Sequence, residues 1–288
     1  MEFKSNKTAL ILEGGALRSQ FTCGVLDVFM ENDIYFPCVC GVSAGSMSAI
    51  SYLSKQIGRT AKITVDYAND KRYISIGNLI KHKMIFNFDF LFDDITYKLE
   101  PLDTDTLFNS RQKLVVFTTN CITGKSVAHE MGICKDILMA CRASSSMPVL
   151  SKTVELDGVE HLDGGIADPI PYKWAFENGY DKVVLVLTRD SNYRKKEQSK
   201  ALEKIYKRTY KKYPELVKTL SNVPKHYNEI ADEITELEKQ GKLFVIRPQE
   251  PVKVKRMEKD VQKLKELYEI GRKIGEEMLR PMTEYLGS

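Results

Sequence analysis

The stretch Cys38-Val-Cys-Gly-Val-Ser-Ala-Gly-Ser46 decides the fold. Its first four residues are small or apolar and are typical of the end of a buried strand. The Ala-, Ser- and Met-rich run that follows predicts a helix over residues 44–56. Gly41, Ser43 and Gly45 form the pattern G-x-S-x-G, in which a serine occupies a sharp turn between a strand and a helix. The glycines let neighbouring backbone pass close by, and the helix N-terminus favours negative charge. The pattern therefore predicts an exposed, nucleophilic Ser43.

Composition sets the class of protein. The chain has 288 residues, of which 43% are hydrophobic, enough to bury a large core in one α/β domain with or without a helical appendage. Residues 1–7 are polar and lead into an apolar run over 8–12 that is too short for a secretory signal. No stretch approaches the roughly 18 apolar residues of a membrane span. We expect a soluble, cytoplasmic protein.

Cysteine and histidine spacing argues against metal chemistry. The six cysteines contain no C-x-x-C pair, which predicts buried, reduced thiols rather than disulfides or a zinc site. The four histidines show no metal-binding spacing. We expect neither a metal nor a cofactor. These residues are Cys23, Cys38, Cys40, Cys121, Cys134 and Cys141, and His82, His129, His161 and His226.

A glycine-rich turn follows the first predicted strand, residues 8–12, and reads Glu13-Gly-Gly-Ala-Leu-Arg-Ser19. Apolar residues at helical spacing come next, so the turn joins a strand to a helix. Backbone N–H groups at a helix N-terminus form an anion site. A nucleotide phosphate, an oxyanion formed during acyl transfer, or no ligand would each suit such a turn. The absence of G-x-G-x-x-G and P-loop patterns disfavours the nucleotide.

The rest of the chain alternates strands and helices, with two hairpins inserted. This order predicts an α/β fold, a three-layer α/β/α sandwich with a mostly parallel central sheet and additional C-terminal helices. The second hairpin leads directly into Asp163-Gly-Gly165. The predicted elements are a helix over 59–69, hairpins over 113–120 with 126–130 and 153–156 with 159–162, helices over 136–143 and 171–179, strands over 182–188 and 243–246, and a helix over 261–285.

Two segments have unusual composition. Residues 84–92 contain four phenylalanines, which either line an acyl pocket, form a lid that touches lipid, or belong to the core. Residues 189–225 hold 12 Lys or Arg against 4 Asp or Glu, with apolar residues at helical spacing. That segment is either a solvated helical face or a site of peripheral contact with anionic membrane lipids. Nucleic acid is not expected, because no binding motif accompanies the charge.

A nucleophilic serine needs a base. In hydrolases with the order Ser, acid, His, the histidine follows the acid, and only His226 does so here, inside the basic helical segment. His161 lies two residues before Asp163 on a predicted strand and is expected to be structural. The residues favour a Ser43–Asp163 dyad, in which Asp163 takes the serine proton directly. The alternative is that Asp163 serves only to form a turn.

Together, Glu13 to Arg18, Gly41 to Gly45 and Asp163 to Gly165 resemble the motifs of the patatin-like phospholipases. The resemblance covers residues 8–188 and extends to the tail, since some bacterial members have a similar late strand and terminal helix. The runs 143–149 and 165–171 also look like that family's usual surroundings of the dyad.

The resemblance implies a modified α/β-hydrolase-like sandwich and a lipid acyl hydrolase of the phospholipase A or esterase type. It implies that Ser43 is the nucleophile and Asp163 the base. The oxyanion N–H groups are then those of Gly14, Gly15 and Ala16, near Arg18. On this basis we expect residues 1–190 to form the catalytic core, 191–240 a basic helical segment packed on it, and 241–288 a strand and helix that complete the same domain.

Two positions depart from the family's loop, which is usually three glycines, one residue, then Arg-Gly. Here Ala16 replaces the third glycine and Ser19 the last. If the loop needs a positive φ at Ala16, the oxyanion hole would be strained and slower. Two alternatives stay open: a hydrolase of small soluble esters or thioesters, and a catalytically silent lipid-binding protein.

Overall fold

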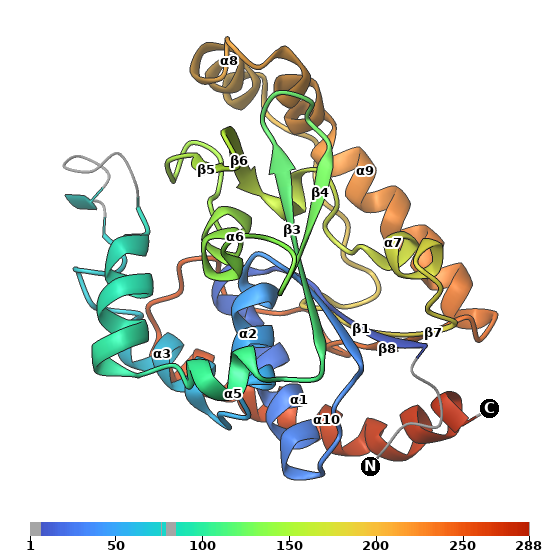
Figure 1. Cartoon of the computed structure of the whole chain (residues 1–288). Helices are drawn as coiled ribbons and strands as arrows, with labels where there is room; N and C mark the ends of the chain where they lie inside the picture. The colour runs from blue at the N-terminus through green and yellow to red at the C-terminus, as the bar shows by residue number, and fades with distance from the viewer. Residues whose placement is uncertain (1–6, 76, 79–84, 288) are drawn as a thin grey trace.

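The computed structural model describes residues 7–75, 77–78 and 85–287 (Figure 1). The N-terminal residues 1–6 and part of the phenylalanine-rich region, including His82 and Met84, lie outside the described residues. No helix in the described ranges is long and apolar enough to cross a membrane. All six cysteines are free thiols, five of them buried and Cys134 partly exposed.

A single eight-stranded sheet forms the centre of the fold, in the order β5-β6-β3-β2-β1-β7-β8, with β4 paired to β3. The five strands from β3 to β8 in that order are parallel, while β4 and β6 pair antiparallel with β3 and β5 pairs antiparallel with β6. The sheet is therefore mostly parallel, as the sequence predicts. The strands are β1 (Thr8–Leu12), β2 (Cys38–Val42), β3 (Lys113–Asn120), β4 (Ser126–Glu130), β5 (Val154–Leu156), β6 (Val159–Asp163), β7 (Lys182–Val186) and β8 (Leu243–Ile246).

Helices cover both faces of this sheet (Figure 1). Alternate strand residues point to opposite faces, so Leu10 and Leu12 pack in one hydrophobic cluster and Ala9 and Ile11 in the other. The result is the expected three-layer sandwich. One face carries α1 (Gln20–Glu31), α2 (Ala44–Leu53), α3 (Arg59–Tyr67), α6 (Ile137–Ser144) and α10 (Val261–Gly287), and the other carries α7 (Tyr172–Glu177) and α9 (Pro214–Lys239).

The C-terminal helix α10 packs backbone against backbone on α1. A Cβ atom added at Gly271 would lie 2.2 Å from the carbonyl oxygen of Phe21, and one added at Gly24 would lie 2.2 Å from that of Tyr268. Only glycine permits such an approach. The end of the chain is thereby fixed against the helix that follows the glycine-rich loop.

The basic segment lies over the edge of the sheet at which the parallel strands end. Within the segment that was predicted to be helical, residues 193–199 form no helix, and the helical part begins with α8 (Lys200–Thr209). Tyr206 on α8 and Tyr210, directly after α8, pack with Leu216 and Leu220 on α9 in a third hydrophobic cluster. This pair of helices covers the edge of the sheet where the loops after β1, β2 and β7 meet.

Candidate active site

Ser43 sits alone in the turn between β2 and α2. Its backbone has φ 53° and ψ −127°, a strained conformation for a residue other than glycine. A Cβ atom at Gly41 would lie 2.4 Å from the Cα of Ser46, and one at Gly45 would lie 2.3 Å from the carbonyl oxygen of Leu12. Both positions therefore need glycine, because neighbouring backbone atoms occupy the space of a side chain.

The structure brings Ser43 and Asp163 together. Ser43 Oγ donates a hydrogen bond to Asp163 Oδ2 at 2.8 Å, and the amide of Gly165 donates to Oδ1 at 2.8 Å. Asp163 is 8% exposed at the end of β6. Burial raises its pKa, and the hydrogen bonds from Gly165 and Ser43 offset part of that rise. Asp163 is thus a better proton acceptor than a solvated aspartate.

The described histidines bond to other groups. His226 Nε2 donates to the carbonyl oxygen of Ala167 at 3.1 Å. His161 Nδ1 and His129 Nε2 both bond to Thr118 Oγ1, at 2.7 and 2.8 Å. Burial and the neighbouring His129 lower the pKa of His161 to about 4, so its ring is neutral at pH 7. Among the residues that the structure describes, Asp163 is the titratable group that accepts a hydrogen bond from Ser43 Oγ.

The glycine-rich loop packs against the serine. A Cβ atom added at Gly14 would lie 2.7 Å from Ser43 Cβ, so the backbone of the loop touches the nucleophile. In the described part of the chain, the amides of Gly14, Gly15 and Ala16 have no hydrogen-bond acceptor. Backbone amides without an acceptor, close to a hydroxyl group, are donors of the kind that stabilise an oxyanion.

Both departures from the family's loop contact each other. Ala16 has φ 49°, so an alanine occupies the left-handed region in which glycine is the usual residue. Ser19 Oγ donates a hydrogen bond of 2.8 Å to the carbonyl oxygen of Ala16. The serine that replaces the family's last glycine therefore supports the strained alanine that replaces its third.

The carboxylate of Glu13 holds this loop in place through hydrogen bonds. Its carboxylate, in a side chain 4% exposed, accepts hydrogen bonds from the Thr188 amide at 2.6 Å, from Thr188 Oγ1 at 3.0 Å and from the Tyr227 hydroxyl at 2.9 Å. These contacts tie the loop to the end of β7 and to α9. The sequence gives no local signal for either partner, because both lie more than 170 residues from Glu13.

Ser144 fixes the backbone of the nucleophile. The amide of Ser43 donates to Ser144 Oγ at 2.7 Å, and that hydroxyl donates to the carbonyl oxygen of Phe117 at 2.6 Å. No role for Ser144 was predicted from the sequence. Its position in a run of three serines before the acid is the signal that was available.

Two cavities meet at Ser43. The main cavity, of about 490 Å³, extends from the glycine loop to α8 and α9 and includes Asp163 and Tyr206 in its lining. The small cavity, of about 50 Å³, lies on the other side and is lined mainly by apolar side chains, including Phe86 and Phe88. Both phenylalanines are buried, so they belong to the core and to the wall of this cavity at once. Phe90 and Phe92 are buried in the core alone.

Arg18 joins the oxyanion loop but not the dyad. Its side chain is 7% exposed and lines the main cavity together with Arg189, Lys195 and Arg256. Burial, followed by the charges of Arg189 and Arg256, lowers its pKa to about 10. Arg18 therefore remains charged at pH 7 beside the candidate oxyanion site.

Comparisons with known proteins find related sequences and a similar fold. The family model for patatin-like phospholipases matches residues 10–176, and the model for a domain of unknown function, DUF6363, matches residues 213–287. The uncharacterized protein YjjU of Escherichia coli (strain K12) is 26% identical over 290 residues, which cover 99% of this chain and 80% of YjjU. The crystal structure of VipD from Legionella pneumophila has a similar fold, with a TM-score of 0.53 and 11% identity over 97% of this chain and 68% of VipD.

Proposed function

The chain belongs to the patatin-like phospholipase family of lipid hydrolases, and from this premise we propose that it cleaves carboxylic esters of acyl lipids through an acyl-enzyme on Ser43. The observation that carries the proposal is the 2.8 Å hydrogen bond from Ser43 Oγ to Asp163, beside a loop in which three amides have no acceptor among the described residues. A hydroxyl is a weak nucleophile until a base takes its proton. Asp163 is that base in the proposal.

In the first step, Ser43 Oγ attacks the ester carbonyl carbon while its proton passes to Asp163 Oδ2. The carbonyl oxygen becomes an oxyanion, which the amides of Gly14, Gly15 and Ala16 hold by hydrogen bonds. The tetrahedral intermediate then collapses, the bond to the alcohol oxygen breaks, and Asp163 returns the proton to that oxygen. The products of this step are the acyl-enzyme and a free alcohol.

In the second step, water attacks the acyl-enzyme. Asp163, ionised again, takes a proton from the water as it bonds to the carbonyl carbon. The same amides hold the second oxyanion. When the bond to Ser43 Oγ breaks, Asp163 gives its proton back to the serine, and the carboxylic acid leaves.

Replacing the proposed base tests this mechanism. Asp163→Asn keeps the shape of the side chain but cannot accept the serine proton, so we expect kcat on a p-nitrophenyl ester to fall by about 10² to 10⁴. Asp157→Asn is the matched control, because Asp157 lies in the turn of the same hairpin and its side chain is exposed. Hydrolysis by Asp163→Asn at the wild-type rate, in folded protein, would eliminate the dyad.

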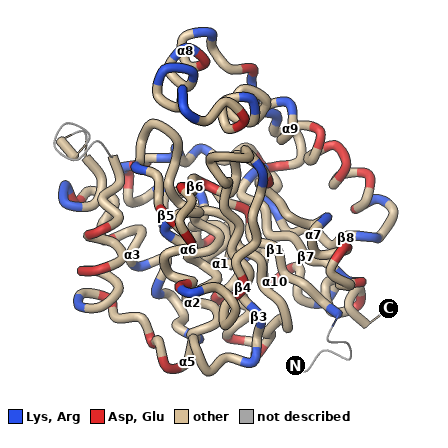
Figure 2. The backbone as a smooth tube through the Cα atoms, turned by 45° about the horizontal axis from the view of Figure 1, so that its top comes forward, with Lys and Arg blue, Asp and Glu red and all other residues tan. Residues whose placement is uncertain are grey.

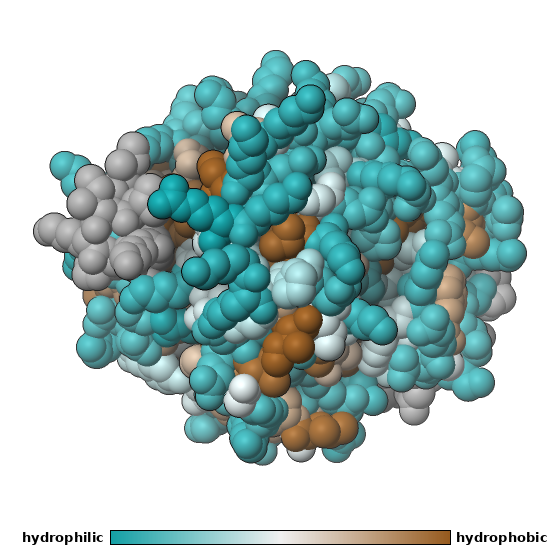
Figure 3. Space-filling model, turned by 90° about the horizontal axis from the view of Figure 1, so that it is seen from above, coloured by the Kyte–Doolittle hydropathy of each residue, from teal (hydrophilic) through white to brown (hydrophobic). Residues whose placement is uncertain are grey.

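We further propose peripheral contact with anionic membranes through the basic helices. Lysines and arginines gather on α8, while acidic residues follow α9 (Figure 2). Viewed from the α8 side, the surface is mainly hydrophilic and its hydrophobic patches are small and separate (Figure 3). Such a face suits attraction by charge rather than deep insertion, at roughly 1 kcal/mol for each basic residue near an anionic bilayer.

Vesicle sedimentation tests this contact. Neutralising Lys207, Arg208, Lys211 and Lys212 should weaken binding to vesicles that contain anionic lipid by about 10² to 10³-fold. The lower figure applies if Lys212 contributes little to membrane binding, because it already pairs with Glu160. Neutralising four basic residues on α10 is the control. Equal binding by the α8 variant and the wild type would rule out this surface.

A further inference from the structure

One wall of the main cavity is positively charged. Five basic side chains line it, and they come from three separate segments: the glycine loop, the strap over residues 189–196 that follows β7, and the segment before α10. We call these residues the cationic wall: Arg18, Arg189, Lys195, Lys196 and Arg256. In the described ranges, no carboxylate lies within ion-pair distance of any of them.

The two carboxylates in the same lining compensate only part of this charge, since they face five basic side chains. Glu13 is held by Thr188 and Tyr227, and Asp163 by Ser43 and Gly165. Both are therefore committed to hydrogen bonds inside the site. The cavity lining carries a surplus of positive charge, which favours an anionic ligand.

Burial is unfavourable for two side chains of the cationic wall. Arg18 is 7% exposed, and its Nε has no hydrogen-bond partner among the described residues. Burial lowers the pKa of Lys195 to about 8, against the attraction of Glu13. A buried donor without an acceptor costs free energy, and an anion in the cavity would recover it.

The shape of the wall also selects among headgroups. Arg189 lies over the ring of Tyr193 at 4.2 Å, and Lys195 over the ring of Tyr227 at 4.1 Å. A quaternary ammonium group binds to free aromatic faces or to carboxylates. Because the protein's own cations cover these two faces, the cavity disfavours a choline headgroup.

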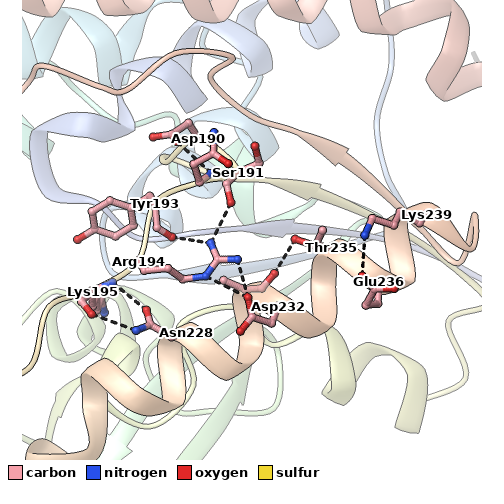
Figure 4. A network of polar contacts seen from close by, with 12 residues as sticks. Asp190, Ser191, Tyr193, Arg194, Lys195, Asn228, Asp232, Thr235, Glu236 and Lys239 are labelled. Carbon is pink, nitrogen blue, oxygen red and sulfur yellow. Dashed lines mark hydrogen bonds and ion pairs between the residues drawn. The ribbon is translucent and has the colours of Figure 1, made fainter.

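Lys195 is held in place by its backbone (Figure 4). Its amide donates to Asn228 Oδ1 at 2.8 Å, and Asn228 Nδ2 donates to its carbonyl oxygen at 3.0 Å. The neighbouring Arg194 bonds to Asp232, so two residues of α9 clamp the strap. The side chain of Lys195 is thus positioned by the fold at the cavity wall.

We propose that the substrate carries a phosphate group, which Lys195 and Arg189 bind together with Arg18, and that these residues set headgroup specificity. This inference rests on the proposed function, which identifies the bond that is cleaved as a carboxylic ester. The ester then lies at Ser43, with the phosphate toward the cationic wall and the acyl chain toward Phe88 in the small cavity. The ligand class is an acyl ester with an anionic phosphate rather than a zwitterionic headgroup.

Binding to the Ser43→Ala variant tests the wall without turnover. Titration calorimetry would compare a monoacylglycerol phosphate, a monoacylglycerol and a monoacylglycerol phosphocholine, each with the same acyl chain below its micelle concentration. Adding Lys195→Met should weaken binding of the first by about 10- to 100-fold, the value of a charge-assisted hydrogen bond, and leave the monoacylglycerol unchanged. Lys195→Arg should restore most of the loss.

Lys265→Met, which removes one exposed charge on α10, is the matched control. A second arm uses glycerol phosphate and inorganic phosphate alone. If they bind as tightly as the lipid and as dependently on Lys195, the source of the phosphate is a free, soluble anion, and the lipid assignment is overturned. Equal affinity for all three lipids, or no effect of Lys195→Met in folded protein, would overturn the phosphate site itself.

These outcomes are separable from the proposed function. Binding of the monoacylglycerol phosphate that depends on Lys195, without hydrolysis by the wild type, would support the cationic wall while the hydrolase proposal fails. Hydrolysis that is equally fast with and without the phosphate group, and insensitive to Lys195→Met, would support the hydrolase while the wall fails.

Discussion

Replacing Ala16 by glycine tests whether the candidate oxyanion loop is strained. Ala16 has φ 49°, and its carbonyl oxygen accepts a hydrogen bond from Ser19 Oγ. An L-residue in the left-handed region costs roughly 1–2 kcal/mol, because its Cβ approaches the following carbonyl oxygen. Glycine lacks that atom, so Ala16→Gly should relieve the strain without moving the amide.

The conformational freedom of glycine in the unfolded chain limits the gain in stability expected for Ala16→Gly. Its greater freedom in the unfolded chain costs about 0.5–1 kcal/mol relative to alanine, so the free energy of unfolding should rise by about 0.5–1 kcal/mol. Ala16→Val should act in the opposite direction, since β-branched residues with positive φ are outliers. Ser19→Ala should lose about 0.5–1.5 kcal/mol, because it removes the bond to the Ala16 carbonyl.

Urea unfolding followed by circular dichroism measures these changes, and ester hydrolysis measures their effect on the site. Lys55→Gly is the control, because Lys55 has φ 57° and is exposed in the turn after α2, outside both cavities. We expect Ala16→Gly to keep or raise kcat, since all three amides remain. A loss of stability in Ala16→Gly, with a gain in Lys55→Gly, would refute strain at Ala16.

Three further changes follow from the same geometry. Gly14→Ala places a Cβ atom 2.7 Å from Ser43 Cβ, so displacement of the nucleophile should lower kcat by about 10²-fold, with unchanged rates contradicting the contact. Burial raises the pKa of Asp163, so protonation should inactivate the site, and kcat/KM should begin to fall on acidification while the pH is still above about 3.9, the usual pKa of aspartate. A value of kcat/KM that stays constant down to that pH would exclude Asp163 as the base. Gly271→Ala places a Cβ atom 2.2 Å from the carbonyl oxygen of Phe21, so urea unfolding should show a loss of about 1–3 kcal/mol, and wild-type stability would mean that α10 does not pack closely on α1.

Short sequence patterns predicted many of the strands and helices. The hairpin over 113–120 and 126–130 was predicted with the bounds that β3 and β4 have, because a run rich in β-branched residues leads into a turn that contains glycine. The helix after Ser43 ends at Leu53 rather than at residue 56, since the chain turns through Lys55 with φ 57°. Such ends depend on single backbone angles, which residue periodicity does not encode.

The candidate dyad was accessible to sequence reasoning because both residues lie in glycine turns at strand ends. The direction of the second strand was not, since β6, which ends at Asp163, runs antiparallel to β3. The cationic wall was not accessible. Arg18 and Arg256 lie far apart in the chain and meet only in the folded protein. Lys195 was assigned to a helical segment, whereas it lies in an extended strap fixed by Asn228. Side chains that converge from separate segments leave no spacing pattern.

Labelling with a fluorophosphonate probe tests the central claim most directly, because the probe reacts with a serine that has been activated as a nucleophile. We would treat purified wild-type protein, Ser43→Ala and Ser46→Ala, and locate the adduct by mass spectrometry. We expect labelling at Ser43 in the wild type and in Ser46→Ala, and none in Ser43→Ala. No labelling of folded wild-type protein, or an adduct on another serine, would contradict it and favour a lipid-binding protein without turnover.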